Sequence, residues 1–185
     1  MTDTDDERNP MILSLFRKKT ASDAVYAVYN SIVAQSRQPV LYTQYGVPDT
    51  VTGRFDMISL HMALLFRRLR HGPESAKAFS QSVFDLFFKD MDRSLREMGV
   101  TDLGVPKKIQ KMGNIFFGLL AALNEALDRD DVEALAGVLA RNIFEGEDTT
   151  RLLALADYVR SRDAELATQS VESITAGQIR FEVAA

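Results

Sequence analysis

Apolar residues recur at three- and four-residue intervals in six stretches of this chain, and this spacing limits the fold more than any other feature. The clearest stretch runs from Phe55 to Leu69, where apolar residues occupy more than one face of a helix. A helix that is apolar on several sides is typical of the centre of a bundle. No convincing strand pattern interrupts the series, so the sequence predicts an all-α fold.

The helix limits follow from residues that start or stop helices. Gly72 and Pro73 end the second helix, Gly99 ends the third, and Pro106 suits the first turn of the fourth. A short helical turn is expected around Leu41, within a loop. The expected helices cover about residues 20–35, 55–70, 73–98, 106–128, 131–143 and 148–167. Thr20 or Ser22 is the expected cap of the first. We therefore expect a single-domain bundle of about six helices with an N-terminal strap.

The length of 185 residues fits one domain with a substantial core. We expect a flexible acidic tail over residues 1–10, a helical domain over 11–167 and a C-terminal tail over 168–185. Residues 178–183 alternate as a strand would, but a lone strand would have no partner. Residues 11–16 are apolar and precede three basic residues, which predicts a strap on the core or, alternatively, a foot on an anionic membrane.

Composition excludes several kinds of function. With no cysteine, the chain has no disulfide, thiolate metal site or cysteine nucleophile. The net charge is -4, most of it in the first ten residues, so bulk charge does not favour binding to nucleic acid. No apolar run approaches the roughly 20 residues of a spanning helix, and the acidic start is unlike a secretory signal or a transit peptide. We expect the protein to work where it is made, in the cytoplasm.

No motif for catalysis or metal binding is present. The two histidines lack metal-ligand spacing. His61, inside the central helix, is interpreted as structural rather than as a catalytic base, and His71 sits at a helix end, where it suits the helix dipole. The sequence predicts no enzyme activity, no metal and no cofactor.

Charged residues are concentrated around the third and fourth helices. Lys107, Lys108 and Lys111 crowd the start of the fourth helix, where the dipole disfavours positive charge. They either pair with Asp92 or Glu97, if the helices fold back on each other, or face an acidic or phosphate-bearing partner. Both explanations stay open.

Two glycines lie within the fourth helix. Gly113 and Gly118 each cost up to about 1 kcal/mol relative to alanine. A close approach between helices is the expected reason for both.

Several blocks of the sequence closely resemble the ubiquinol–cytochrome c chaperone family. Order and spacing agree over roughly residues 24–159. Where the family often has tyrosine after Phe116, this chain has Phe117. The blocks are "YGVPDTVTGRFDM" (45–57), "LHMALLFRRLR" (60–70), "DMDRSLREMGVTDLGVPKKIQKM" (90–112), "FFG" (116–118) and, more weakly, "ARNIF" (140–144).

The resemblance implies a bacterial assembly factor rather than an enzyme. Its client would be cytochrome b of the respiratory ubiquinol–cytochrome c reductase, with a small partner subunit or the ribosome as further partners and no recognition of nucleic acid sequence. It would act in the cytoplasm or peripherally on the inner face of the plasma membrane. The alternatives are a helical ligand-binding protein, with a polar pocket of Arg54, His61 and Asp92, and a membrane-surface adaptor.

The two strongest blocks, residues 45–70 and 90–118, are expected to lie side by side and to form the client surface. Tyrosine and arginine are common at binding hot spots, and lysines suit a polar rim. The predicted partner-binding residues are Tyr42, Tyr45, Arg54, Asp92, Arg96, Lys107, Lys108, Lys111 and Phe117.

Overall fold

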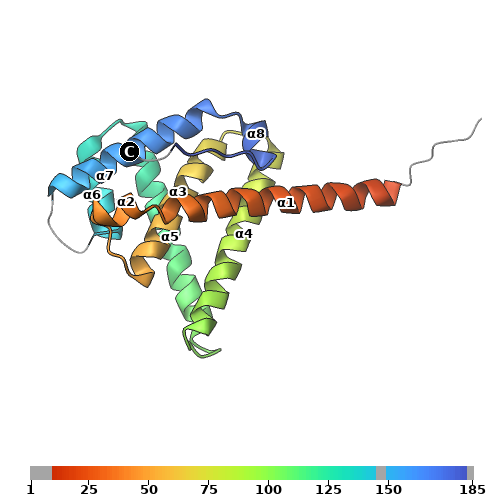
Figure 1. Ribbon diagram of the computed structural model, residues 1–185, viewed down its shortest axis with the longest axis horizontal. Coiled ribbons are helices and arrows are strands. Elements are labelled where there is room, and N and C mark those ends of the chain that lie inside the picture. Colours follow the sequence, from red (N-terminus) through yellow and green to blue (C-terminus); the bar gives the residue numbers. More distant parts are fainter. Residues whose placement is uncertain (1–9, 145–148, 183–185) are drawn as a thin grey trace, which may run out of the picture.

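The described part of the chain, residues 10–144 and 149–182 of a computed structural model, is helical and contains no strand, which confirms the all-α prediction (Figure 1). The expected acidic tail falls almost entirely outside this part. Six helices are long and two are single five-residue segments, including one at the expected turn around Leu41. They are α1 (Pro10–Ser36), α2 (Pro39–Thr43), α3 (Val51–Leu69), α4 (Glu74–Glu97), α5 (Val105–Asp128), α6 (Val132–Asn142), α7 (Thr149–Thr168) and α8 (Val171–Thr175).

Helix α3 is the centre of the molecule, as predicted. Every residue from Met57 to Leu65 is buried, and α3 packs against α1, α4, α5 and α7 (Figure 1). The helix begins at a true cap, because the Thr50 hydroxyl accepts a hydrogen bond from the Gly53 amide at 3.0 Å. The Asp131 carboxylate caps α6 in the same way, through the Ala134 amide at 2.8 Å.

The predicted start of the first helix was wrong. We expected a cap at Thr20 or Ser22, but α1 begins at Pro10 and continues without a break to Ser36. No glycine or proline lies between residues 11 and 35, so nothing stops the helix from extending. Residues 11–16 are therefore the first turns of α1, which projects beyond α4 instead of lying on the core as a strap (Figure 1).

The expected C-terminal tail is part of the folded body over residues 169–182. Ile174 on α8 and Ile179 after it are buried in the core. The Arg162 guanidinium of α7 donates to the Glu182 carbonyl at 2.7 Å, which fixes the end of this segment. The alternation of residues 178–182 reflects one buried side chain followed by an exposed one, not strand pairing.

Three arginines at the end of α3 connect neighbouring helices. Arg67 pairs with Asp128 of α5 at 2.6 Å and with Asp163 of α7 at 3.0 Å. Arg70 also pairs with Asp128, at 2.7 Å, and Arg68 donates to carbonyls at the end of α7. Hydrogen bonds from Arg70 and Arg67 hold the pKa of Asp128 well below its usual range.

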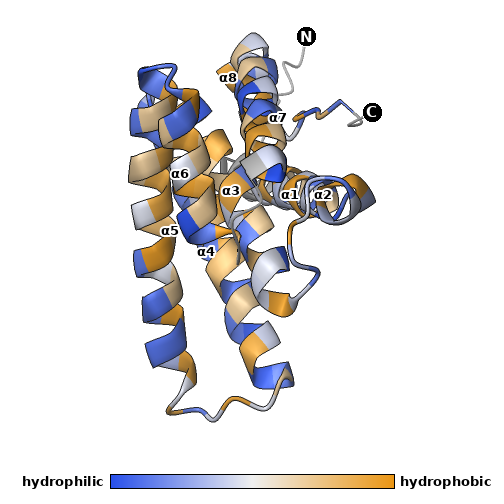
Figure 2. Ribbon diagram, turned by 90° about the vertical axis from the view of Figure 1, so that its left-hand side faces the viewer, coloured by the Kyte–Doolittle hydropathy of each residue, from blue (hydrophilic) through white to orange (hydrophobic). Residues whose placement is uncertain are grey.

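Helices α4 and α5 form an antiparallel hairpin that extends away from the other helices (Figures 1 and 2). Gly99 ends α4 in the left-handed conformation, with φ of 82°, as predicted. The Val100 amide then donates to the Leu95 carbonyl at 3.0 Å, which closes the turn. We call residues 98–104, which connect the two helices, the hairpin end.

Candidate functional site

Two arginines of α4 hold the acidic side chains near the hairpin end. Arg96 Nε donates to Asp92 Oδ2 at 2.7 Å, and its Nη1 pairs with Asp102. Arg93 Nε lies 3.8 Å from Glu97 Oε1. The carboxylates that the α5 lysines could have used are therefore already paired.

The three lysines on the first turns of α5 have no such partners. Lys107, Lys108 and Lys111 are exposed, and none forms an ion pair with any residue that the structure describes. The proposed pairing with Asp92 or Glu97 is thus not found. The helix also begins without a side-chain cap, so its positive dipole end and three free ammonium groups lie together.

An aromatic cluster joins α3, α4 and α5 above these lysines. The Phe84 ring lies 4.5 Å from Phe88 and 5.5 Å from Phe117, measured between centroids. Phe66 of α3 meets the buried Phe116 edge-on at 5.8 Å. Phe117 is the exposed member, with 56% of its surface accessible to solvent.

An open groove of about 290 Å³ runs along this cluster between α3, α4 and α5. It could take an apolar side chain of a partner, since half of its lining residues are aromatic or aliphatic. It is lined by Phe66, Leu69, Arg70, Lys77, Ser80, Gln81, Phe84, Phe117, Leu120 and Asn124.

The outer face of α5 carries apolar side chains beside a glycine. Ile115 is 41% exposed and flanks Gly118 together with Phe117. Apart from its chain neighbours and the backbone of its own helix, no atom lies within 4 Å of where a Cβ on Gly118 would be, and a Cβ on Gly113 would meet only the Phe88 ring at an ordinary 3.8 Å. The close helix approach that we expected at both glycines is therefore not found within the described part of the protein. We call Ile115, Phe117 and Gly118 the α5 face.

The two predicted tyrosines support the segment around α2. The Tyr42 hydroxyl donates to the Ser36 carbonyl at 2.7 Å, and the Tyr45 ring packs against Tyr158 of α7 at 5.4 Å. Both side chains are half-buried, and burial raises the pKa of Tyr42. Most of their surface is thus committed to internal contacts.

Arg54 is exposed, and its Nε donates to Asp49 Oδ1 at 2.8 Å in a pair at the start of α3.

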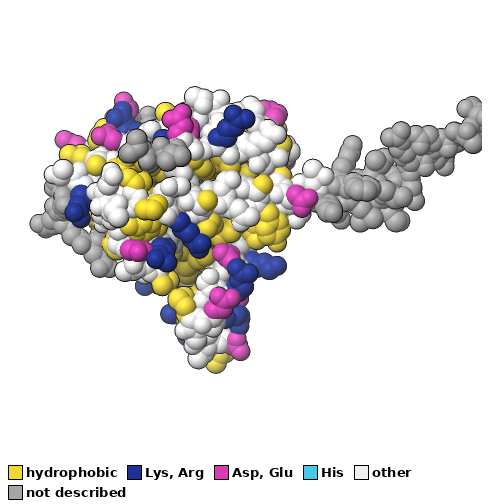
Figure 3. Space-filling model, viewed as in Figure 1, with side chains coloured by type: hydrophobic (Ala, Val, Ile, Leu, Met, Phe, Trp, Pro, Cys, Tyr) yellow, Lys and Arg dark blue, Asp and Glu magenta, His cyan; other side chains and the backbone are white. Residues whose placement is uncertain are grey.

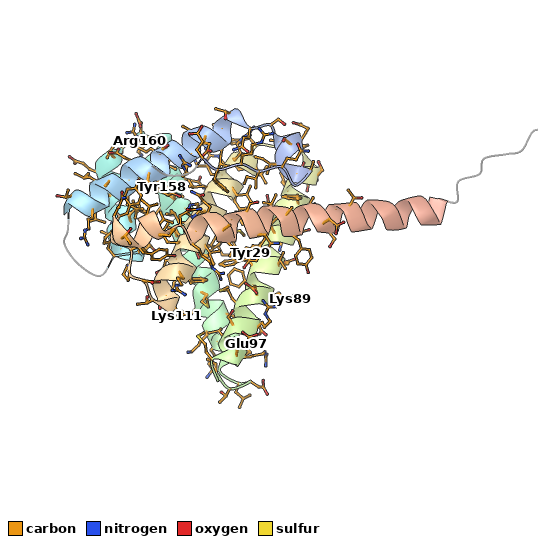
Figure 4. All side chains as sticks on the ribbon, in the orientation of Figure 1. Tyr29, Lys89, Glu97, Lys111, Tyr158 and Arg160 are labelled. Atoms are coloured by element: carbon orange, nitrogen blue, oxygen red, sulfur yellow. The ribbon has the colours of Figure 1, made fainter. Side chains whose placement is uncertain are left out.

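The predicted binding residues divide between two places in the fold. Figure 4 shows Lys111 and Glu97 on the hairpin, whereas Tyr158, which Tyr45 contacts, lies on α7 away from it. One group, near α2, comprises Tyr42, Tyr45 and Arg54; the other, on the hairpin, comprises Asp92, Arg96, Lys107, Lys108, Lys111 and Phe117.

The two family-like blocks nevertheless contact each other through their apolar sides. Phe55 of α3 stacks on Phe87 of α4, which adjoins the second block, with centroids 5.6 Å apart. Phe66 and Phe116 make the corresponding contact with α5. Aromatic packing thus holds the hairpin to α3, while α1 packs against α4 and α6 packs against α5.

His61 belongs to a buried polar network, consistent with its interpretation as structural. Its Nδ1 lies 2.7 Å from the Met57 carbonyl and 3.0 Å from Ser36 Oγ, and its Nε2 lies 2.7 Å from the Tyr158 hydroxyl. The Gln35 amide also donates to that hydroxyl, at 2.9 Å. Complete burial lowers the pKa of His61 to about 4. Sequence reasoning could not find Gln35, Ser36 and Tyr158, because they come from α1 and α7.

The polar pocket imagined for a ligand-binding protein does not form. His61 is fully buried, Arg54 pairs with Asp49 at the start of α3, and Asp92 pairs with Arg96 on the hairpin. These three side chains point into no shared cavity. The geometry does not favour this alternative.

Asp56 is a titratable group that sequence reasoning missed. It lines a small cavity of about 170 Å³ beside Thr52 and Asn142, and it has no hydrogen-bond or ion-pair partner among the described residues. Burial raises its pKa to about 7. Only its position inside the family-like block of residues 45–57 could have pointed to it.

Residues 10–144 and 149–182 contain no group of three side chains placed to hold a metal ion. In the same ranges, no helix is both long and apolar enough to cross a membrane.

Comparisons with known proteins agree with the sequence blocks. A family model described as "Ubiquinol-cytochrome C chaperone" matches residues 43–181, and so includes the C-terminal segment that the resemblance had left out. A Xenopus laevis protein, "Ubiquinol-cytochrome-c reductase complex assembly factor 1", is 22% identical over 153 residues, 82% of this chain and 76% of its own. The "Crystal structure of the Cbp3 homolog from Brucella abortus" is 42% identical, with a TM-score of 0.83 over 92% of this chain and 96% of that one. The chain belongs to the ubiquinol–cytochrome c chaperone family, whose members are assembly chaperones of the reductase complex.

Proposed function

We propose that this protein is a non-enzymatic chaperone that binds cytochrome b during assembly of the reductase, and that the α5 face is where the client binds. Cytochrome b is a membrane protein, so before assembly it has apolar helices to cover. Exposed phenylalanine and isoleucine beside a groove suit such a client. The chaperone would act in the cytoplasm or on the inner face of the plasma membrane.

The observation that carries the proposal is Gly118. A glycine within an exposed helix face costs up to about 1 kcal/mol, and nothing inside the protein requires it. A helix of another protein could approach α5 closely at this point, because small residues allow two backbones to come near each other. Ile115 and Phe117 would then pack on either side of the client helix.

The unpaired lysines would form a polar rim on the same helix. Lys107, Lys108 and Lys111 lie on the turns of α5 between the face and the hairpin end. Exposed charges of this kind speed up encounter more than they strengthen the complex. Tyr42, Tyr45 and Arg54 lie near α2, apart from the hairpin, and would make only a second, separate contact with the client. A small partner subunit or the ribosome would have to bind elsewhere on the protein.

The test is recovery of cytochrome b with tagged protein from membranes in mild detergent. Gly118→Leu and Phe117→Ser should each reduce recovery by at least about fivefold, the effect of losing a hot-spot contact. Ala164→Leu, which makes the same kind of change at an exposed position of α7, is the control and should recover the client normally.

Thermal unfolding distinguishes lost binding from lost folding. Both α5 variants should keep the Tm of the native protein within a few degrees, because position 118 has open space around it and Phe117 is the exposed member of the aromatic cluster. If Gly118→Leu folds normally and recovers as much cytochrome b as the native protein, the client does not bind on this face.

A further inference from the structure

The hairpin end exposes two large apolar side chains at the extremity of the molecule. Leu103 has 87% of its surface accessible and Met98 has 51%. Both belong to the connection between α4 and α5, at the lower end of the projection in Figures 1 and 3. Neither residue is buried in the core, so together they form a small apolar tip.

The charges around these residues are unevenly balanced. Between Asp92 and Lys111 the chain has five basic and three acidic residues, a net charge of +2 within a protein of net charge -4. All three acids are engaged by Arg93 or Arg96, as described above. The three lysines are left as the free charges beside an apolar tip.

We propose that the hairpin end docks on an anionic lipid bilayer, with Leu103 and Met98 entering the interfacial region and Lys107, Lys108 and Lys111 meeting the headgroups. Apolar side chains combined with a cluster of bases are the two features that give reversible binding to such surfaces. Because only two apolar residues take part, the binding is weak and peripheral.

The backbone of the hairpin end is suited to shallow insertion. The Gly99, Val100 and Gly104 amides donate to carbonyls of Arg96, Leu95 and Thr101 at 2.9, 3.0 and 2.8 Å. These groups therefore need little water, which lowers the free-energy cost of entering the headgroup region.

The exposed Leu103 argues for a lipid bilayer rather than RNA as the anionic partner of the hairpin end. RNA could neutralise the lysines, but it would gain nothing from a fully exposed leucine. The inference deepens the proposed function and rests on its placement at the inner face of the membrane, because it names the residues that would meet the lipid. Docking in this way would also bring the α5 face next to the bilayer in which a cytochrome b helix lies.

The chain contains no tryptophan, which allows a direct test. Leu103→Trp introduces a single indole at the tip, and tryptophan prefers the membrane interface. With vesicles of phosphatidylglycerol and phosphatidylcholine, its fluorescence should shift to shorter wavelength, and it should not shift with phosphatidylcholine alone. Leu153→Trp, at an exposed position on α7, is the matched control and should stay in water.

The same indole fluorescence tests the role of the lysines and whether the anionic partner is a bilayer. Adding Lys107→Glu and Lys108→Glu to Leu103→Trp should weaken vesicle binding at least about tenfold, since each lysine near an anionic surface is worth about fivefold. Lys89→Glu, an exposed lysine on α4 that also has no ion pair in the described chain, should have little effect. An indole at position 103 that stays in water while the protein binds vesicles would overturn the proposal and point to residues 10–19. Lysine-dependent binding to RNA without a vesicle-induced shift would overturn it as well.

The membrane test and the client test can fail independently. Gly118→Leu should bind vesicles normally, and Leu103→Trp should recover cytochrome b normally in detergent.

Discussion

At the scale of single residues, His61 shows how a side chain with three hydrogen-bonding contacts can still make the fold sensitive to acid. Its ring is satisfied by Met57, Ser36 and Tyr158 in the neutral form. Protonation would place a charge in the core near Arg162, whose own charge also lowers the pKa of His61. The network thus stabilises the protein only while the imidazole is neutral.

The pH dependence of stability follows from the sign of this shift. The pKa of His61 is about 4 in the folded protein and 6.5 when unfolded, so its contribution is complete above pH 6.5 and is lost as the pH falls toward 4. The loss amounts to about 3 kcal/mol at most. Urea unfolding from pH 7 to pH 4 should show a steeper decline for the native protein than for His61→Gln.

Asp56 gives the opposite trend, because its raised pKa makes folding less favourable as the pH rises from about 4 to about 7. The comparison is therefore best made in an Asp56→Asn background. Equal slopes with and without His61 in that background would contradict the assignment, as would a protonated His61 ring in the NMR spectrum of the folded protein at pH 5.5.

At the scale of elements, the hairpin separates what sequence can predict from what it cannot. Gly99 and Pro106 marked the turn correctly, because glycine and proline act locally. The pairing of the lysines stayed open, because Arg93 and Arg96 compete for the same carboxylates and only side-chain positions decide between them. The same limit applies to the start of α1, where a possible cap was present but nothing stopped the helix.

The free lysines lead to a prediction about α5 itself. Lys107→Glu with Lys108→Glu should leave the free energy of unfolding unchanged or raise it by up to about 1 kcal/mol, because acidic residues suit a helix N-terminus and no ion pair is lost. Chemical denaturation measures this directly. A loss of more than 1 kcal/mol would mean that the lysines have partners within the fold.

At the scale of the whole molecule, helical spacing predicted the class, the central helix and the approximate limits of most helices. It failed after residue 167, because the buried residues there are too widely spaced to form a periodic pattern. The candidate site was only partly predictable. Residue types nominated Phe117 and the lysines, but the internal contacts of Tyr42 and Tyr45 depend on residues far away in the chain.

The C-terminal segment should be essential to stability. Ile174 is fully buried, so Ile174→Ala should lower the free energy of unfolding by about 2–5 kcal/mol. Urea denaturation provides the measurement, with Ala176→Gly, an exposed change in the same segment, as the control. A native-like midpoint for Ile174→Ala would show that the segment lies on the body without stabilising it.

The contact between the last segment and the first helix also affects how the protein is made. The backbone of Gly177 lies so close to α1 that a Cβ there would come within 3.1 Å of Ala24 Cα, although the two residues stand near opposite ends of the chain. During synthesis, α1 emerges before α8, so the face of α1 around Ala24 stays exposed until the segment around Gly177 has been made. A chain stalled before Ser170 would leave part of its own core open to water. The surface beneath Ile174 and Ile179 is therefore buried only after these two residues have been synthesised.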